Sequence, residues 1–394
     1  MNRPIYLDHH ATTPVDERVL EAMAPWWRED FGNASSATHV YGWRAEAAVE
    51  QAREQLAAAI GAADPREIVF TSGATESDNL ALAGVLRAAR DRDHLVTTAV
   101  EHPAVLDTGR ALAAQGFRTT ELPVDSDGRV DPDAVAGALD ARTALVSVGA
   151  ANGEVGTLLP LAEIGERCRA AGVPFHSDAA QAVGKIPLDV ERDRVDLLSF
   201  SAHKLYGPKG IGALYVRGAG RRPKLAPLLH GGGHERGLRS GTLPVPLVVG
   251  FAAAVSICLE ERAEESLRLA ALRDRLHERL RAELPGVLLN GPVEGRLPAN
   301  LNLSFEGVRA DELLPTLHDV AVSTGSACAS ARGEPSHVLR ALGLSAERAA
   351  GAVRFGLGRD TTEAEIDTAA ARVAEEARKA RSGVGPLRRP GRGG

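Results

Sequence analysis

Two charged residues that follow apolar stretches could together hold a cofactor with a carbonyl group. Lys204 comes just after the mainly apolar run 195–200, and Asp178 comes just after the run 173–176. Burial can remove the proton from a lysine so that its amine forms a Schiff base with an aldehyde, and a carboxylate can pair with a protonated pyridine ring. The pair therefore points to pyridoxal 5'-phosphate as the cofactor.

The alternative is that Lys204 is a solvated loop lysine and Asp178 a turn former, which is the common state of these residue types. Both residues, however, lie where short apolar strands are predicted to end. Ligands of open α/β sheets bind outside the carboxyl ends of the strands. The two positions therefore favour the cofactor site.

A glycine turn after the apolar run 68–70 could bind the phosphate of such a cofactor. The segment 71–76 reads Thr-Ser-Gly-Ala-Thr-Glu and precedes a helical pattern. Small residues would let the backbone beside Ala74 and the Thr75 hydroxyl approach an anion at the positive end of a helix. Threonine followed by glutamate is also an ordinary helix cap, so this segment alone leaves both interpretations open.

His102 stands between another apolar run and a helix that we expect to begin near Ala104. An imidazole there could stack on a cofactor ring and move protons near neutral pH, although a single histidine is more often structural. Six other histidines form no recognisable combination, and we expect surface or packing roles for them. They are His9, His10, His39, His94, His277 and His318.

The three cysteines show no metal-type spacing. Cys168 lies in a helical pattern and Cys258 in an apolar one, so both are predicted to be small buried hydrophobic residues. Cys328 lies in the run of small residues 323–333, which offers little to a core. It is a candidate nucleophile on a mobile loop, and an unreactive loop thiol is the alternative.

The order of the elements predicts an α/β fold with a mostly parallel sheet covered by helices. Helical stretches alternate with strand-like runs, which lie at 68–70, 95–98, 144–148, 173–176, 197–200 and 212–216.

We expect two domains, because 394 residues exceed what one small core needs. The large domain is predicted over 16–244, and a smaller α+β domain over 1–15 and 245–381. The second includes a linking helix to about residue 284, strands at 300–305, 320–324 and 353–357, and a last helix at 362–380. The Gly-, Pro- and Arg-rich stretch 382–394 is predicted to be a disordered tail.

The composition is that of an ordinary globular protein, with 44% hydrophobic and 25% charged residues. A net charge of −6 argues against direct binding of nucleic acid. No signal peptide or membrane-spanning run is visible, so we expect a cytoplasmic protein in a reducing compartment, where disulfides are unfavourable.

Taken together, these segments resemble cysteine desulfurases, the pyridoxal-phosphate enzymes of the class V aminotransferase family. The loop 325–328, Gly-Ser-Ala-Cys, resembles the branch that serves iron–sulfur assembly and tRNA thiolation. The resemblance implies a large domain like that of fold type I pyridoxal-phosphate enzymes. Matching segments, which span nearly the whole chain, are 6–8 with 11–14, 31–33, 71–79, 201–204, 230–236 and 239–242.

The resemblance also implies a role for each matched residue. Lys204 would bind the cofactor and remove the Cα proton of L-cysteine, and Cys328 would take the sulfur as a persulfide and pass it to an acceptor protein. His102 would stack on the ring and manage the proton of the substrate thiol. Asp178 would pair with the pyridine nitrogen, and Gln181 would contact the ring oxygen. The phosphate would be bound by Ala74, Thr75, Ser201 and His203, with Thr242 reaching in from the partner subunit of a homodimer. The substrate carboxylate would be held by Asn33 and Arg354.

The chain departs from the family pattern at two places. Where Gly153 stands, the family usually has a second asparagine that helps bind the ring oxygen, a contact that Asn152 or water could replace. Loss of one such hydrogen bond could cost about 1 kcal/mol of cofactor binding. The tail also lacks the apolar and aromatic end with which the iron–sulfur branch docks its scaffold.

Two other functions remain open from the sequence. One is a different pyridoxal-phosphate reaction, such as that of a transaminase or selenocysteine lyase, neither of which requires the Cys328 nucleophile. The other is a non-catalytic scaffold for sulfur transfer. The acceptor could be an iron–sulfur scaffold, a tRNA or DNA thiolation enzyme, or a sulfur carrier.

Overall fold

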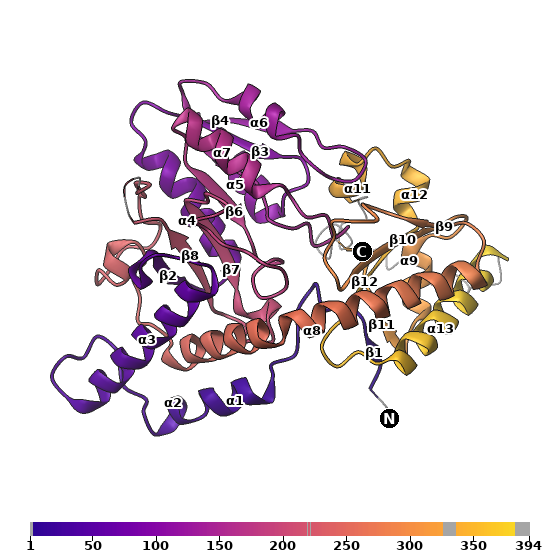
Figure 1. Ribbon diagram of the computed structural model, residues 1–394, viewed down its shortest axis with the longest axis horizontal. Coiled ribbons are helices and arrows are strands. Elements are labelled where there is room, and N and C mark those ends of the chain that lie inside the picture. Colours follow the sequence, from indigo (N-terminus) through magenta and orange to yellow (C-terminus); the bar gives the residue numbers. More distant parts are fainter. Residues whose placement is uncertain (1–2, 219, 221, 326–335, 383–394) are drawn as a thin grey trace, which may run out of the picture.

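The computed structural model describes residues 3–218, 220, 222–325 and 336–382 (Figure 1). A seven-stranded sheet has the order β2-β8-β7-β6-β5-β3-β4. Its strands are β2 (Ile68–Thr71), β3 (His94–Thr98), β4 (Arg118–Leu122), β5 (Thr143–Ser147), β6 (Phe175–Asp178), β7 (Leu197–Ser201) and β8 (Gly212–Val216).

All neighbouring pairs in this sheet are parallel except those of β8, which runs antiparallel to both β2 and β7. The predicted mostly parallel sheet is therefore confirmed. The edge strand β4 was not predicted, because its sequence Arg-Thr-Thr-Glu-Leu lacks the apolar run by which the other strands were found. Polar edge strands of this kind protect a sheet from pairing with other chains.

Alternate strand residues face two different helical layers. Phe70, for example, belongs to the core beneath α3 (Val40–Ala59), α6 (Pro132–Ala138) and α7 (Leu161–Ala171). Val69, its neighbour in β2, belongs to the opposite core beneath α4 (Ala74–Ala88) and α5 (Pro103–Ala113). The sheet is thus buried on both faces, as parallel sheets require.

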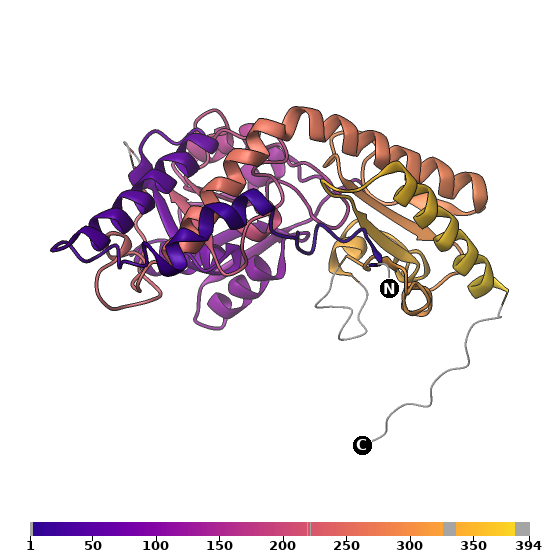
Figure 2. The same cartoon turned by 90° about the horizontal axis from the view of Figure 1, so that it is seen from below.

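The long helix α8 (Val245–Glu283) runs past both the large sheet and a three-stranded sheet (Figures 1 and 2), and it contributes to two cores. Phe251 in its first half packs in the core of the large sheet, whereas Leu276 in its second half packs in a separate core with Phe355. This second core lies between α8, α13 (Glu363–Arg381) and the sheet β12-β10-β9. Those strands are β9 (Val287–Leu289), β10 (Asn300–Phe305) and β12 (Ala352–Gly356).

The first strand of the chain, β1 (Ile5–Tyr6), pairs in parallel with β11 (Val320–Ala321), which is shorter than the predicted run 320–324. The domain boundaries remain a prediction. The other helices are α1 (Glu17–Met23), α2 (Pro25–Arg28), α9 (Ala310–Leu313), α11 (His337–Ala341) and α12 (Ala346–Ala350).

No helix within the described ranges is long and apolar enough to cross a membrane. Cys328 and the predicted tail from residue 383 onward lie outside the described residues.

A buried ion pair fastens α3 to the segment after β8. The Arg53 guanidinium donates to both carboxylate oxygens of Glu235 at 2.9 Å, and the two side chains are 3% and 2% exposed. Glu235 also accepts the Phe70 N–H at 2.8 Å. Because both charges are out of water, each depends on the other for its solvation.

We expect Glu235→Ala to lower the free energy of unfolding by about 3–5 kcal/mol, because it leaves a buried Arg53 without its countercharge. The matched control is Glu50→Ala, since Glu50 also pairs with Arg53 but is 52% exposed. That substitution should cost at most ~1 kcal/mol. Urea unfolding of both variants measures the difference, and equal costs would contradict the role of the buried pair.

Candidate active site

Lys204 lies in the turn that follows β7, and its amine is enclosed by the N-terminal segment. The Nζ donates to the backbone oxygens of His10 at 2.6 Å and Ala11 at 2.8 Å. Burial, and then the charge of Arg354, lowers the pKa of Lys204 to about 8. The lowered pKa increases the fraction of the amine that is unprotonated near neutral pH, which is the form that Schiff-base formation requires.

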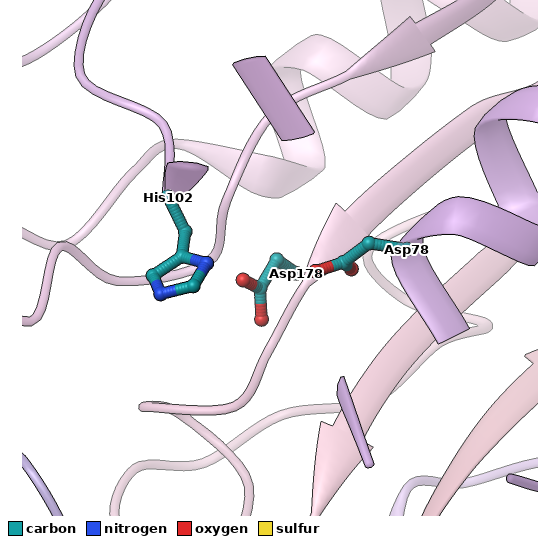
Figure 3. A group of neighbouring side chains, drawn as sticks. All are labelled: Asp78, His102 and Asp178. Carbon is teal, nitrogen blue, oxygen red and sulfur yellow. The ribbon is translucent and has the colours of Figure 1, made fainter. Parts of the chain in front are cut away.

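Three side chains meet beside this lysine. Asp178 at the end of β6, His102 before α5 and Asp78 on α4 have ligand atoms within 4.8 Å of one another, and Figure 3 shows Asp178 between the other two. The charge of Asp178 affects the pKa of Lys204, and the charges of both residues affect the pKa of His102, so the four groups belong to one site. The residue types could hold a metal ion, but the lysine beside them favours a carbonyl cofactor.

The His102 imidazole is neutral and has a defined tautomer. Loss of solvation among the surrounding residues is the main cause that lowers its pKa. The Nδ1 accepts the backbone N–H of Ala104 at 3.1 Å, so the proton is on Nε2. The residue as a whole is exposed, so its ring can receive a stacking partner and its Nε2–H can exchange protons.

Asp78 is a member of the site that the sequence did not reveal, because it lies inside the regular pattern of α4. It is fully buried, and burial followed by repulsion from Asp178 raises its pKa well above the usual range. Its Oδ1 is 3.6 Å from Nε2 of His176, whose own pKa is lowered to about 3 by burial. Burial therefore keeps both Asp78 and His176 neutral.

The start of α4 fits a phosphate. Its N-cap residue, Gly73, offers no side-chain hydrogen bond, so the first N–H groups of the helix are left for another acceptor. Thr75 is exposed in the first turn, and Ser201 lies close by, since a Cβ on Gly73 would be 3.9 Å from its Oγ. Nδ1 of His203 lies 3.1 Å from Oγ1 of Thr12. A buried lysine, an aspartate and this cradle together fit pyridoxal phosphate.

Gln181 is held by neighbours on both sides of its amide. Its Oε1 lies 3.1 Å from Nδ1 of His10 and 2.7 Å from Nζ of Lys185, and its Nε2 donates to the His10 backbone oxygen at 2.9 Å. His10, which we expected to have only a surface or packing role, is 2% exposed. Its ring contacts Gln181, and its backbone oxygen accepts from Lys204. No sequence signal distinguished it or Lys185.

The side chain of Asn152 is used by the backbone around it. Its Oδ1 accepts the N–H groups of Glu154 and Val155, and its Nδ2 donates to the Val100 oxygen at 3.0 Å. Gly153 beside it lies against Gln181. The geometry thus gives Asn152 a role in shaping the turn.

Arg354 on β12 connects the three-stranded sheet β12-β10-β9 to the site. It pairs with Asp8 at 2.8 Å and donates to the backbone oxygens of Gly153 at 3.1 Å and Gly325 at 3.0 Å. Gly325 is the last described residue before the segment that contains Cys328. Arg354 is thus placed beside the start of that segment and close enough to Lys204 to affect its pKa.

Two predicted site residues are not brought together with the others. Asn33 is exposed and accepts the Ser35 N–H, and Thr242 is exposed on the loop that Arg239 ties to Glu76 of α4. Within residues 3–325, neither makes a hydrogen bond to Lys204. Cys168 and Cys258 are free and buried, as predicted.

Asp78→Asn should remove a pH-dependent loss of stability. The folded protein holds a proton on Asp78 that the unfolded chain, with a pKa of 3.8, releases, so this residue lowers the free energy of unfolding as the pH rises above that value. We expect the free energy of unfolding of the variant, relative to that of wild type, to rise by more than about 1 kcal/mol from about pH 5 to about pH 8. Urea unfolding at both pH values measures it. The exposed Asp311→Asn is the control, and an equal gain there would contradict the assignment.

Comparison with known proteins places this site in a family. The model of the family described as "Aminotransferase class-V" matches residues 5–368. A cysteine desulfurase IscS from Anaeromyxobacter sp. (strain Fw109-5) is 54% identical over 390 residues, which cover 98% of this chain and 95% of that protein. A solved NifS-like protein superposes with a TM-score of 0.88 at 40% identity, covering 94% of this chain and 98% of that one. A structure titled "SspA in complex with cysteine" has a TM-score of 0.79 at 38% identity, covering 90% and 98%. These matches and the geometry above establish that the chain belongs to the class V aminotransferase family.

Proposed function

We propose that the protein is a pyridoxal-phosphate-dependent cysteine desulfurase, which converts L-cysteine to L-alanine and takes the sulfur on Cys328. The observation that carries the proposal is the partly unprotonated Lys204 beside Asp178 and His102. Relatives named cysteine desulfurase support the reaction, and the structure titled "SspA in complex with cysteine" supports the substrate.

The cofactor supplies an electron sink for the negative charge that forms at the substrate Cα. Lys204 would hold its carbonyl group and would take the Cα proton. Asp178 would pair with the pyridine nitrogen. His102 would stack on the ring, Gln181 would donate to the ring oxygen, and Ala74, Thr75, Ser201 and His203 would hold the phosphate.

Arg354 would hold the substrate carboxylate. Asn33, which is not brought together with the other site residues here, is assigned as a second donor on the family resemblance alone. Cys328, as a thiolate, attacks the sulfur of the substrate. The substrate C–S bond breaks while an S–S bond forms on Cys328, and the remaining carbon skeleton takes up protons and leaves as alanine. His102 would manage the proton of the substrate thiol from its exposed Nε2 side, because its Nδ1 already accepts the Ala104 N–H.

A homodimer is part of the proposal, since Thr242 is assigned to the phosphate of the partner subunit. Large apolar side chains are exposed around α2 and the start of α3, where burial by a second copy would stabilise the assembly. They include Trp27 at 58%, Phe31 at 65% and Trp43 at 54% exposed.

The sulfur acceptor is proposed to be a protein, and the reaction to occur in the cytoplasm. A selenocysteine lyase is the second candidate, because the carbonyl-cofactor site would serve it equally and only Cys328 separates the two reactions.

Cys328→Ser should abolish sulfur transfer while leaving cofactor binding intact, because serine cannot form a persulfide. Purified protein with pyridoxal phosphate and L-cysteine is assayed for alanine, for sulfide released by a reductant, and for intact mass. We expect wild type to give alanine and a gain of one sulfur atom, and the variant to give neither. Alanine from the variant at the wild-type rate would replace the proposal with a lyase reaction.

Phe31→Glu should dissociate the dimer, because it introduces a charge into the proposed apolar contact. Leu267→Glu is the matched control, since Leu267 is 77% exposed on α8 away from this group. Sedimentation velocity of both variants distinguishes monomer from dimer. A dimeric Phe31→Glu protein, or a monomeric wild type, would contradict the assigned contact.

A further inference from the structure

We propose that Lys185 is a positioning residue. Together with His10 it holds the Gln181 amide in one orientation, so that Gln181 presents a fixed N–H donor to the ring oxygen of the cofactor. The inference rests on the proposed cofactor role of Gln181. It goes beyond that role by assigning a function to a half-buried lysine that the proposed reaction does not use.

Two donors converge on a single oxygen of Gln181. Lys185 Nζ lies 2.7 Å from Oε1, and His10 Nδ1 lies 3.1 Å from the same atom. Because an amide oxygen can only accept, His10 must have its proton on Nδ1. Reversing the amide would turn its NH₂ group toward these two donors and would lose the hydrogen bond from Nε2 to the His10 backbone oxygen.

One N–H of Gln181 remains for the cofactor. The NH₂ group has two hydrogens, and one of them goes to the His10 oxygen at 2.9 Å. That same oxygen accepts the Lys204 amine at 2.6 Å, so the Gln181 amide and the cofactor-binding amine share a neighbour. In pyridoxal phosphate the ring oxygen and the aldehyde are on adjacent ring carbons. A donor beside Lys204 is therefore suitably placed for the ring oxygen.

Lys185 is suited to hold an amide rather than to act as a base. It lines the same cavity as Lys204, and among the described residues the one hydrogen bond of its side-chain amine goes to Gln181. Burial, and then the charge of Lys204, lowers the pKa of Lys185 to about 7. Both the ammonium and the neutral amine carry N–H groups, so the contact with Gln181 persists in either state.

Gly153 is the steric counterpart of this arrangement. A Cβ at this position would lie 2.9 Å from Nε2 and 3.0 Å from Cγ of Gln181. The glutamine cannot easily move away, because its amide is fixed at both ends. The glycine therefore leaves the space that the fixed amide occupies.

The test is Lys185→Met, which keeps an unbranched apolar stem but cannot donate. The full chain is stripped of cofactor and titrated with pyridoxal phosphate, followed by the visible absorbance of the bound cofactor. We expect the affinity to fall about tenfold, as for the loss of one oriented hydrogen bond. The pH at which the absorbance band changes should rise, because the ring oxygen becomes more basic without its donor. A residue that only supported folding would not shift this spectrum.

Gln181→Leu should produce both effects, and the double variant should be no worse than Gln181→Leu alone, because Lys185 acts through Gln181. Lys185→Arg, which retains a donor, should keep the affinity within about threefold of wild type and serves if Lys185→Met does not fold. The exposed Lys224→Met is the control and should match wild type.

An unchanged affinity in Lys185→Met, or additive losses in the double variant, would overturn the positioning role. Wild-type production of alanine from L-cysteine reports separately on the proposed function. A desulfurase in which Lys185→Met binds the cofactor normally would refute this inference alone.

Discussion

The desolvated amine of Lys204 is the interaction on which the arrangement of the site depends. Its hydrogen-bond acceptors are two neutral backbone oxygens, those of His10 and Ala11, rather than a carboxylate. Neutral acceptors satisfy the N–H groups without stabilising a full positive charge, so burial can lower the lysine pKa to about 8. An amine held in this way is ready to attack a carbonyl group without first losing a strong ion pair.

This constraint explains the path of the N-terminal segment. After β1, which pairs with β11, the segment crosses to the turn that carries Lys204. There the Thr13 hydroxyl donates to the His203 backbone oxygen at 3.0 Å. Asp8 on the way pairs with Arg354. The acceptors of the amine and the partner of the proposed substrate-binding arginine therefore belong to one short segment. Any shift of that segment would change both the hydrogen bonds of the Lys204 amine and the ion pair of Arg354.

The sequence predicted those features that depend on local patterns. Apolar runs predicted six of the seven strands of the large sheet, and strand ends located Lys204 and Asp178, because buried parallel strands and their ligand-binding edges leave a continuous apolar signature. The polar edge strand β4 carried no such signature. Asp78, Lys185 and His10 were also not identified, since their importance comes from burial and from neighbours that are distant in the chain.

The buried carboxyl group of Asp78 shows why such distant neighbours matter. Two carboxylates this close cannot both be ionised at low cost, and burial decides which of them keeps the proton. Asp78 is fully enclosed within α4, whereas Asp178 is partly accessible at the strand end and accepts the Ala180 N–H at 2.9 Å. Burial thus raises the pKa of Asp78, so that its carboxyl group keeps its proton and adds no second negative charge beside Asp178.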